Sequence, residues 1–181
     1  MDMSDSDPPS DGDTPDGFDA PSDAGPLADR DTVTEVIRAR GHENVTAEHA
    51  STFEFTTDDW LTPAGDCILA VDADRTPRDF DPAFRAACQD SEATIVATIT
   101  VESADDSVEN DTHSVRIVGR GDPELTLLDD RSMVGRTSGY TDDERTILVD
   151  ADAAAADLDR DLVDALSDGG ASVRLRLDVE P

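Results

Sequence analysis

Apolar and polar residues alternate with a period of two along much of this chain, and this alternation limits its possible folds more than any other feature. The final segment, VRLRLDV at residues 173–179, is a clear example. Side chains along a β-strand point alternately to opposite faces, so the pattern predicts strands with one buried face. Strands are expected at residues 33–40, 45–56, 67–71, 93–101, 113–118, 125–128, 146–149 and 173–179.

Two helices complete the expected elements. Asp81-Pro82 is typical of a helix start, with an N-cap followed by proline in the first helical position. Asp150 is expected to cap a second helix that ends near Ser167, before Gly169-Gly170. Because strands dominate and do not alternate with helices, we predict a mainly β (α+β) sandwich or barrel with two ancillary helices. No internal repeat is evident.

The first 30 residues differ in composition from the remainder. They contain nine aspartates and five prolines, with few large apolar residues. Such a segment cannot bury enough apolar surface to offset the entropy lost on ordering. We therefore predict a disordered acidic tail over residues 1–30 and a single β-rich domain over residues 31–181.

The charged residues exclude some chemistries and suggest an environment. The chain has 44 acidic and 14 basic residues, a formal net charge of −30, and every basic residue is arginine. Without lysine there can be no pyridoxal phosphate Schiff base and no phosphate-binding P-loop. We interpret the acidic composition as halophilic, that is, as adaptation to molar salt, where charges are screened over roughly 3 Å. Net charge then does not exclude an anionic ligand.

Localisation and macromolecular partners follow from what the sequence lacks. No stretch approaches the ~18 consecutive apolar residues of a membrane span, and the N-terminus has no basic-then-apolar signal. A cytoplasmic protein with no membrane partner is expected. Because Trp60 and Tyr140 are each the single residue of their type, stacking on nucleic-acid bases is not favoured.

Three clusters contain residues that could carry chemistry. In the first, His42 and Asn44 follow a glycine at a junction between strands, and His49 lies seven residues beyond His42. Together with Cys67, the two histidines have the ligand chemistry of zinc, although their spacing matches no standard zinc motif. A core histidine at position 49 and a turn histidine at position 42 form the simpler interpretation.

The second and third clusters offer a thiol and a set of guanidinium groups. Asp66 and Cys67 could form a base and a nucleophile, or Asp66 could fix a turn. In the third cluster Arg136 and Ser138 are followed by Arg145, and arginine forks with hydroxyls suit a phosphate or carboxylate. Because acidic residues flank these arginines, internal ion pairs are the alternative.

The body of the chain resembles an archaeal family of uncharacterised proteins, the domain of unknown function 371. The resemblance is carried by GHENV at 41–45, HASTFEFT at 49–56, LTPAGDCI at 61–68 and the stretch from Arg136 to Thr146. The composition further suggests a haloarchaeal-type member. The resemblance implies a mainly β, jelly-roll-like domain and no assigned activity.

The leading hypothesis is a domain that binds a small anionic ligand, with a hydrolytic activity as an extension of it. His42, His49, Asp66 and Cys67 would be catalytic, while Asn44, Arg136, Ser138 and Arg145 would bind the ligand. A second hypothesis is an RNA- or protein-binding module without catalysis. In a third, the clusters fix turns and the domain serves assembly.

Overall fold

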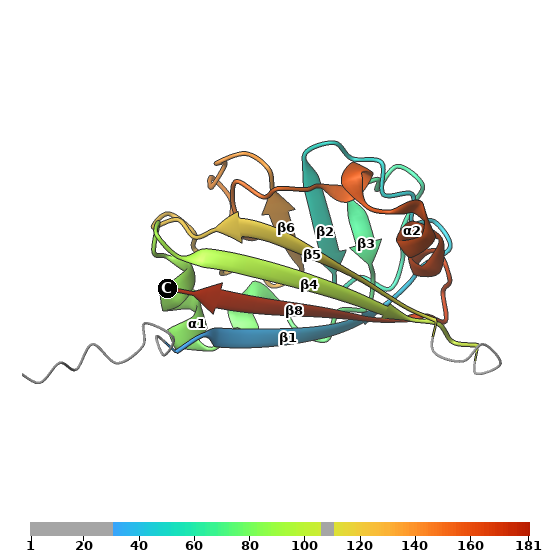
Figure 1. Cartoon of the computed structure of the whole chain (residues 1–181), viewed down its shortest axis with the longest axis horizontal. Coiled ribbons are helices and arrows are strands. Elements are labelled where there is room, and N and C mark those ends of the chain that lie inside the picture. The colour runs from blue at the N-terminus through green and yellow to red at the C-terminus, as the bar shows by residue number, and fades with distance from the viewer. Residues whose placement is uncertain (1–30, 106–110) are drawn as a thin grey trace, which may run out of the picture.

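Two four-stranded β-sheets pack as layers in the computed structural model, which describes residues 31–105 and 111–181 (Figure 1). The predicted tail, residues 1–30, lies outside the described residues. The long sheet has the order β1-β8-β4-β5, with β1 (Val33–Arg40), β8 (Ser172–Glu180), β4 (Thr94–Glu102) and β5 (Thr112–Arg120). The short sheet has the order β3-β2-β6-β7, with β3 (Ile68–Ala70), β2 (Thr52–Thr56), β6 (Ser132–Arg136) and β7 (Thr146–Leu148). The predicted mainly β fold is confirmed as an α+β sandwich rather than a closed barrel.

The hydrophobic core lies between the two sheets. Phe53 and Phe55 of β2 are fully buried, as are Ile95 and Ile99 of β4. Alternate residues of each strand face inward, which is the arrangement that a period of two predicts. The helices α1 (Pro82–Cys88) and α2 (Arg160–Leu166) lie at opposite ends of the long sheet (Figure 1).

The chain folds twice into the same unit, although the sequence repeats only short stretches such as VDAD at 71–74 and 149–152. The first half runs β1, β2, β3, η2 (Pro77–Asp79), α1, β4, and the second half runs β5, β6, β7, η3 (Ala155–Asp157), α2, β8. Backbone details recur at matching positions: Ala47 and Leu127 both have positive φ, and so do Asp72 and Asp150. The prediction of no repeat was therefore wrong, because the halves share backbone geometry and apolar positions more than residue identities.

A pseudo-twofold axis relates the halves and passes through both sheets. Where β2 pairs with β6, Glu54 lies opposite Val134, its own counterpart in the second half. Where β4 pairs with β8, Thr98 lies opposite its counterpart Arg176. Residues next to the axis therefore come from both halves, and a site at the axis contains side chains of both.

One helix was predicted correctly and the other too early. The Asp81 side chain accepts a hydrogen bond from the Ala83 backbone and Pro82 begins α1, as predicted. The second helix begins at Arg160 behind the N-cap Asp159, whereas Asp150 binds Arg120. None of the helices in the described part of the chain has the length and apolar character needed to cross a membrane.

The strand prediction failed in three places. Only Thr52–Thr56 of the expected strand 45–56 is extended, residues 125–128 form no strand, and β6 was not predicted. Residues 41–51 and 121–131 are matching turns whose buried Val45 and Leu125 imitate a strand pattern. Irregular backbone that buries alternate side chains cannot be distinguished from a strand by periodicity alone.

Candidate functional site

The outer face of the short sheet is polar and yet buried. Thr52, Glu54 and Thr56 alternate with the core phenylalanines of β2, so they point away from the core. Thr56 is only 2% exposed and Ser132 of β6 only 5%. A polar sheet face that lies outside the core is normally wet, so its burial marks it as a candidate site.

A cavity of about 490 Å³ opens onto this face. Its walls come from β2, β6, the first residue of β3 and the segments next to these strands, with Trp60 56% exposed among the lining residues. The lining residues are Glu54, Thr56, Asp58, Trp60, Leu61, Thr62, Gly65, Ile68, Asp129, Arg131, Ser132, Asp143, Glu144 and Arg145. Five of them are carboxylates and two are arginines, so the lining is net acidic.

Glu54 stands at the centre of the polar network beside this cavity. Its Oε2 accepts a hydrogen bond from the Cys67 thiol at 3.2 Å, and its Oε1 lies 3.7 Å from an Arg145 nitrogen. Arg145 also lies 3.5 Å from Asp143. Both distances are long for a charge-assisted hydrogen bond, and the Arg145 side chain is 44% exposed. Arg145 therefore keeps donor capacity that it can direct into the cavity.

Arg136, by contrast, is bound closely by partners within the chain. Its guanidinium donates to Asp143 at 2.5 Å and to the Thr146 hydroxyl at 2.8 Å. It also lies over the Tyr140 ring, 4.8 Å from the centroid. These contacts are all internal, as in the alternative that the flanking acids suggest for this arginine.

The environment of Cys67 keeps its thiol protonated. Burial first, and then the negative charge and hydrogen bond of Glu54, raise its pKa to about 12, although a hydrogen bond from Thr52 opposes the shift. A nucleophilic cysteine needs a cation or imidazole that lowers its pKa. The thiol is therefore a hydrogen-bond donor to Glu54 in this arrangement.

Asp143 has the opposite shift. Burial alone would raise its pKa, but hydrogen bonds from the Thr146 hydroxyl and backbone, together with Arg136, lower it below its ordinary value. Asp143 is therefore a stable anion that holds Arg136 in place and lies beside Arg145.

Both histidines use Nδ1 to hold the backbone. The ring of His42 accepts from the Asn44 N–H at 3.0 Å, and the ring of His49 accepts from the Thr52 N–H at 3.1 Å. The Thr52 hydroxyl also lies 2.9 Å from His49 Nδ1. With Nδ1 as the acceptor, a neutral imidazole carries its proton at Nε2. These contacts agree with the turn interpretation of His42.

The structure brings some of the predicted site residues together and separates others. His49, Cys67, Arg136 and Arg145 meet around the polar face through Thr52, Glu54 and Asp143, as the contacts above show. Asn44 instead donates to the Leu61 carbonyl at 2.7 Å and thereby ties two loops together. Asp66 and Ser138 contribute backbone carbonyls, which accept from His49 and Asp150. The backbone of His42 donates to Leu166 at the end of α2.

No metal centre is evident in the part of the chain that the structure describes. Groups of three or more His, Cys, Asp or Glu side chains suited to a metal ion are absent there. The candidate ligands His42, His49 and Cys67 therefore do not form such a group, because their nitrogen and sulfur atoms have separate partners.

Sequence reasoning missed Glu54, Asp143 and Trp60. Glu54 lies between two core phenylalanines, so a period of two places it on a face that ordinarily faces solvent. Trp60 was noted only for its rarity. Glu54 is an acidic residue in a strand whose other residues are apolar or carry a hydroxyl group, and this contrast could have indicated the site. That inference also requires knowing that other segments cover this face of the sheet.

Comparisons with known proteins connect the chain to one family. The model of the family described as "Domain of unknown function (DUF371)" matches residues 37–180. The chain is also 37% identical over 134 residues to "Uncharacterized protein MJ0206" of the archaeon Methanocaldococcus jannaschii. That alignment covers 74% of this chain and 91% of the relative. Neither description assigns a reaction or a ligand.

Proposed function

The chain belongs to the family of the domain of unknown function 371, and we propose that it binds a small ligand whose cationic group lies against Trp60 in the cavity of the short sheet. The proposal rests on the relation between the two halves. Thr56 and Arg136 are counterparts, because they are the last residues of the matching strands β2 and β6. Trp60 and Tyr140 each lie four residues further along the chain. The backbone contacts support this alignment, since Ala73 donates to Thr56 as Ala151 does to Arg136.

One observation carries the proposal: the second half fills with its own side chain the space that the first half leaves open. The Arg136 guanidinium lies over Tyr140 at 4.8 Å. In the first half the short Thr56 side chain leaves a cavity beside Trp60. Arg136 thus serves as an internal example of the group that the open space accepts, a planar cation over an aromatic ring.

The charges around the cavity support a cation as well. Five carboxylates and two arginines line it, and one of those arginines, Arg131, is held by Asp58 at 2.6 Å. A guanidinium or ammonium group that enters the cavity meets net negative charge and an aromatic face.

An anionic group, which the sequence analysis expects in the ligand, can bind beside Arg145 in the same cavity. Arg145 is held at 3.5 Å or more by Asp143 and Glu54, so its donors are free to meet a carboxylate or phosphate. A ligand with both an acidic and a basic group can place the acidic group against Arg145 and the basic group against Trp60. Hydrolysis at His42, His49, Asp66 and Cys67 stays an extension of this proposal, and the protonated Cys67 thiol gives it no support.

The single tryptophan of the chain makes the test direct. Agmatine has a guanidinium and a primary ammonium but no carboxylate, arginine adds a carboxylate, citrulline replaces the guanidinium of arginine by a neutral ureido group, and acetate has only the anion. We expect agmatine and arginine to change Trp60 fluorescence in a saturable way at constant ionic strength, and citrulline to bind at least about tenfold more weakly than arginine.

Two variants provide the structural control. Thr56→Arg should fill the cavity as Arg136 fills the other half, and should abolish the response. Thr112→Arg adds the same charge at an exposed position of β5 and should leave the response unchanged. Equal binding of citrulline and arginine, or an unaltered response in Thr56→Arg, would contradict the proposal. Where Thr56→Arg does not fold, Asp58→Asn serves in its place and should weaken agmatine binding.

A further inference from the structure

A second group of arginines lies on the opposite side of the molecule, on the outer face of the long sheet. Arg38 of β1, Arg116 of β5, and Arg174 and Arg176 of β8 are all exposed there. The register joins them across the sheet, because Arg38 pairs with Arg174 and Thr98 lies between Arg176 and Arg116. We call this group the arginine face.

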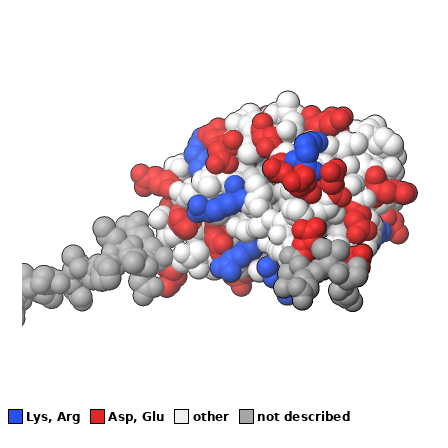
Figure 2. Space-filling model, turned by 45° about the vertical axis from the view of Figure 1, so that its right-hand side comes forward, with Lys and Arg blue, Asp and Glu red and all other residues white. Residues whose placement is uncertain are grey.

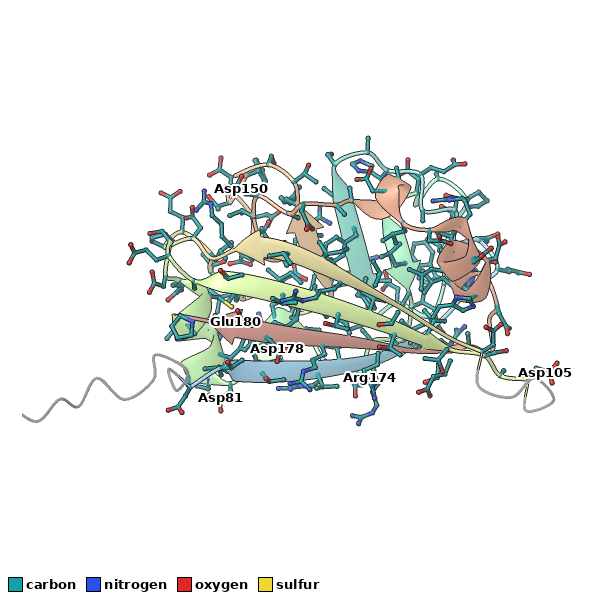
Figure 3. All side chains as sticks on the ribbon, in the orientation of Figure 1. Asp81, Asp105, Asp150, Arg174, Asp178 and Glu180 are labelled. Carbon is teal, nitrogen blue, oxygen red and sulfur yellow. The ribbon has the colours of Figure 1, made fainter. Side chains whose placement is uncertain are left out.

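Arg38 and Arg174 lie directly opposite each other on neighbouring strands. Like charges in that position repel and destabilise the strand pair. Among the described residues, neither guanidinium takes part in a salt bridge or in a hydrogen bond, and Arg176 alone has a carboxylate partner, Asp178 at 2.9 Å. Figure 3 shows Arg174 on β8 where that strand runs beside β1.

The lack of partners is unusual within this chain. It has 44 acidic residues, and seven arginines elsewhere in the described segments form salt bridges with them. Figure 2 shows acidic side chains over much of the visible surface, with arginines among them. Two opposed arginines that keep no carboxylate in such surroundings leave their donors to an external anion.

The surface at the arginine face is shaped as well as charged. A hollow of about 260 Å³ is lined by Val36, Arg38, Thr98, Thr100, Arg174 and Arg176. Guanidinium forks and hydroxyl groups together are the donors that a phosphate group requires. The lining contains no aromatic side chain, so it offers phosphate contacts without stacking on bases.

We propose that the arginine face binds a phosphate group, with Arg38 and Arg174 as its principal contacts. The phosphate neutralises two charges that otherwise repel each other. The same pair of arginines therefore destabilises the free sheet and binds the ligand. The phosphate can belong to a small phosphorylated molecule or to a nucleic-acid backbone, since the two present the same group. This site is separate from the cavity beside Trp60 and does not depend on it.

The test combines a binding readout with a stability readout on the full chain. The probes are inorganic pyrophosphate, followed by calorimetry, and a fluorescent single-stranded RNA of mixed sequence, followed by anisotropy. Both are used at the lowest potassium chloride concentration at which the protein stays folded, because salt weakens such contacts. The variants are Arg38→Gln, Arg174→Gln and their double, with Arg78→Gln as a control that removes an exposed arginine paired with Asp130.

The double variant should lose at least about tenfold in affinity and should also melt at a higher temperature than the wild type. Arg78→Gln should bind as the wild type does. Binding of pyrophosphate without RNA assigns a small ligand, and binding of RNA assigns a nucleic-acid backbone. The proposal fails if the wild type binds neither probe, if the double variant binds both unchanged, or if the double variant is less stable than the wild type.

Discussion

His49 and Asp129 hold the same turn in the two halves of the molecule. His49 Nδ1 accepts from the backbone of Ser51 and Thr52, and Asp129 Oδ1 accepts from that of Arg131 and Ser132. An imidazole in the first half thus replaces a carboxylate in the second. The shared geometry gives His49 a structural role that is independent of any proton transfer.

Replacing His49 by its counterpart should therefore preserve the fold. We expect His49→Asp to stay within about 1 kcal/mol of the wild type in the free energy of unfolding, and His49→Ala to lose about 1–2 kcal/mol because two backbone donors lose their acceptor. Denaturant unfolding at constant salt measures both. Equal losses in the two variants would show that the turn does not depend on the acceptor.

The fold was more predictable than the site because the two depend on different information. The alternation in 173–179 and the Asp81-Pro82 start are local signals, and β8 and α1 follow from them. The site depends on which segments cover the short sheet, and that is decided by contacts between distant residues. The sequence indicates Cys67 and Arg145 as members of two separate clusters. Glu54 contacts both, but in the sequence it resembles any other polar residue of a strand.

The duplication was hidden for a related reason. Counterparts such as His42 and Asp122 share a task rather than an identity, because each side chain accepts a backbone N–H two residues ahead. A search for repeated letters does not detect equivalence of this kind. The matching positive φ angles reveal it once the backbone is known.

Asp143 should make stability depend on acid. Because its pKa is lowered in the folded state, its contribution is complete above the ordinary value of 3.8 and is lost as the pH falls through the folded value. We expect Asp143→Asn to cost about 1–2 kcal/mol at neutral pH, and this cost to vanish in strong acid, where the wild-type carboxyl is also neutral. Unfolding curves from pH 7 down to pH 2 measure it. The exposed neighbour Asp142 supplies the control, and a difference that persists unchanged into acid would contradict the assignment.

The thiols should respond to alkali. Burial, followed by nearby carboxylates, raises the pKa of Cys67 and of Cys88 to about 12. Their contribution to stability is therefore complete below the ordinary value of 9.0 and is lost as the pH rises toward 12. At pH 8 we expect Cys67 to react with iodoacetamide at least about a hundredfold more slowly than a free thiol, because little thiolate is present.

The variant Glu54→Gln isolates the carboxylate's part in this effect. It removes the negative charge that disfavours the thiolate, so alkylation of Cys67 should become several-fold faster while that of buried Cys88 stays the same. Peptide mass mapping separates the two sites. A Cys67 rate that is fast in the wild type, or indifferent to Glu54, would show that the thiol is not held in its protonated form.

The acidic composition should make folding depend on salt. With a net charge of −30, self-repulsion opposes the compact state at low ionic strength, and at about 1 M salt the screening length falls to roughly 3 Å. We expect the melting temperature to rise steeply with potassium chloride up to molar concentrations. Thermal unfolding monitored by circular dichroism tests this, and a melting temperature independent of salt would contradict the halophilic interpretation.

The pseudo-twofold symmetry predicts equal losses of stability at two glycines where the halves contact each other. A Cβ at Gly41 would collide with the carbonyl oxygens of Leu166 and Asp168, and a Cβ at Gly121 with those of the counterparts Cys88 and Asp90. Gly41→Ala and Gly121→Ala should therefore each cost about 3 kcal/mol, because a backbone carbonyl cannot move aside as a flexible side chain can.

A third glycine supplies the control for this pair. A Cβ at Gly169 would meet no atom of the described residues within 4 Å, so Gly169→Ala should leave the free energy of unfolding nearly unchanged. Denaturant unfolding compares the three variants directly. If the losses of unfolding free energy in Gly41→Ala and Gly121→Ala differed widely, the two contacts between the halves would not be energetically equivalent. The halves would then share the path of the backbone but not its stability. Similar costs would mean that each half depends equally on the other to close its own turn.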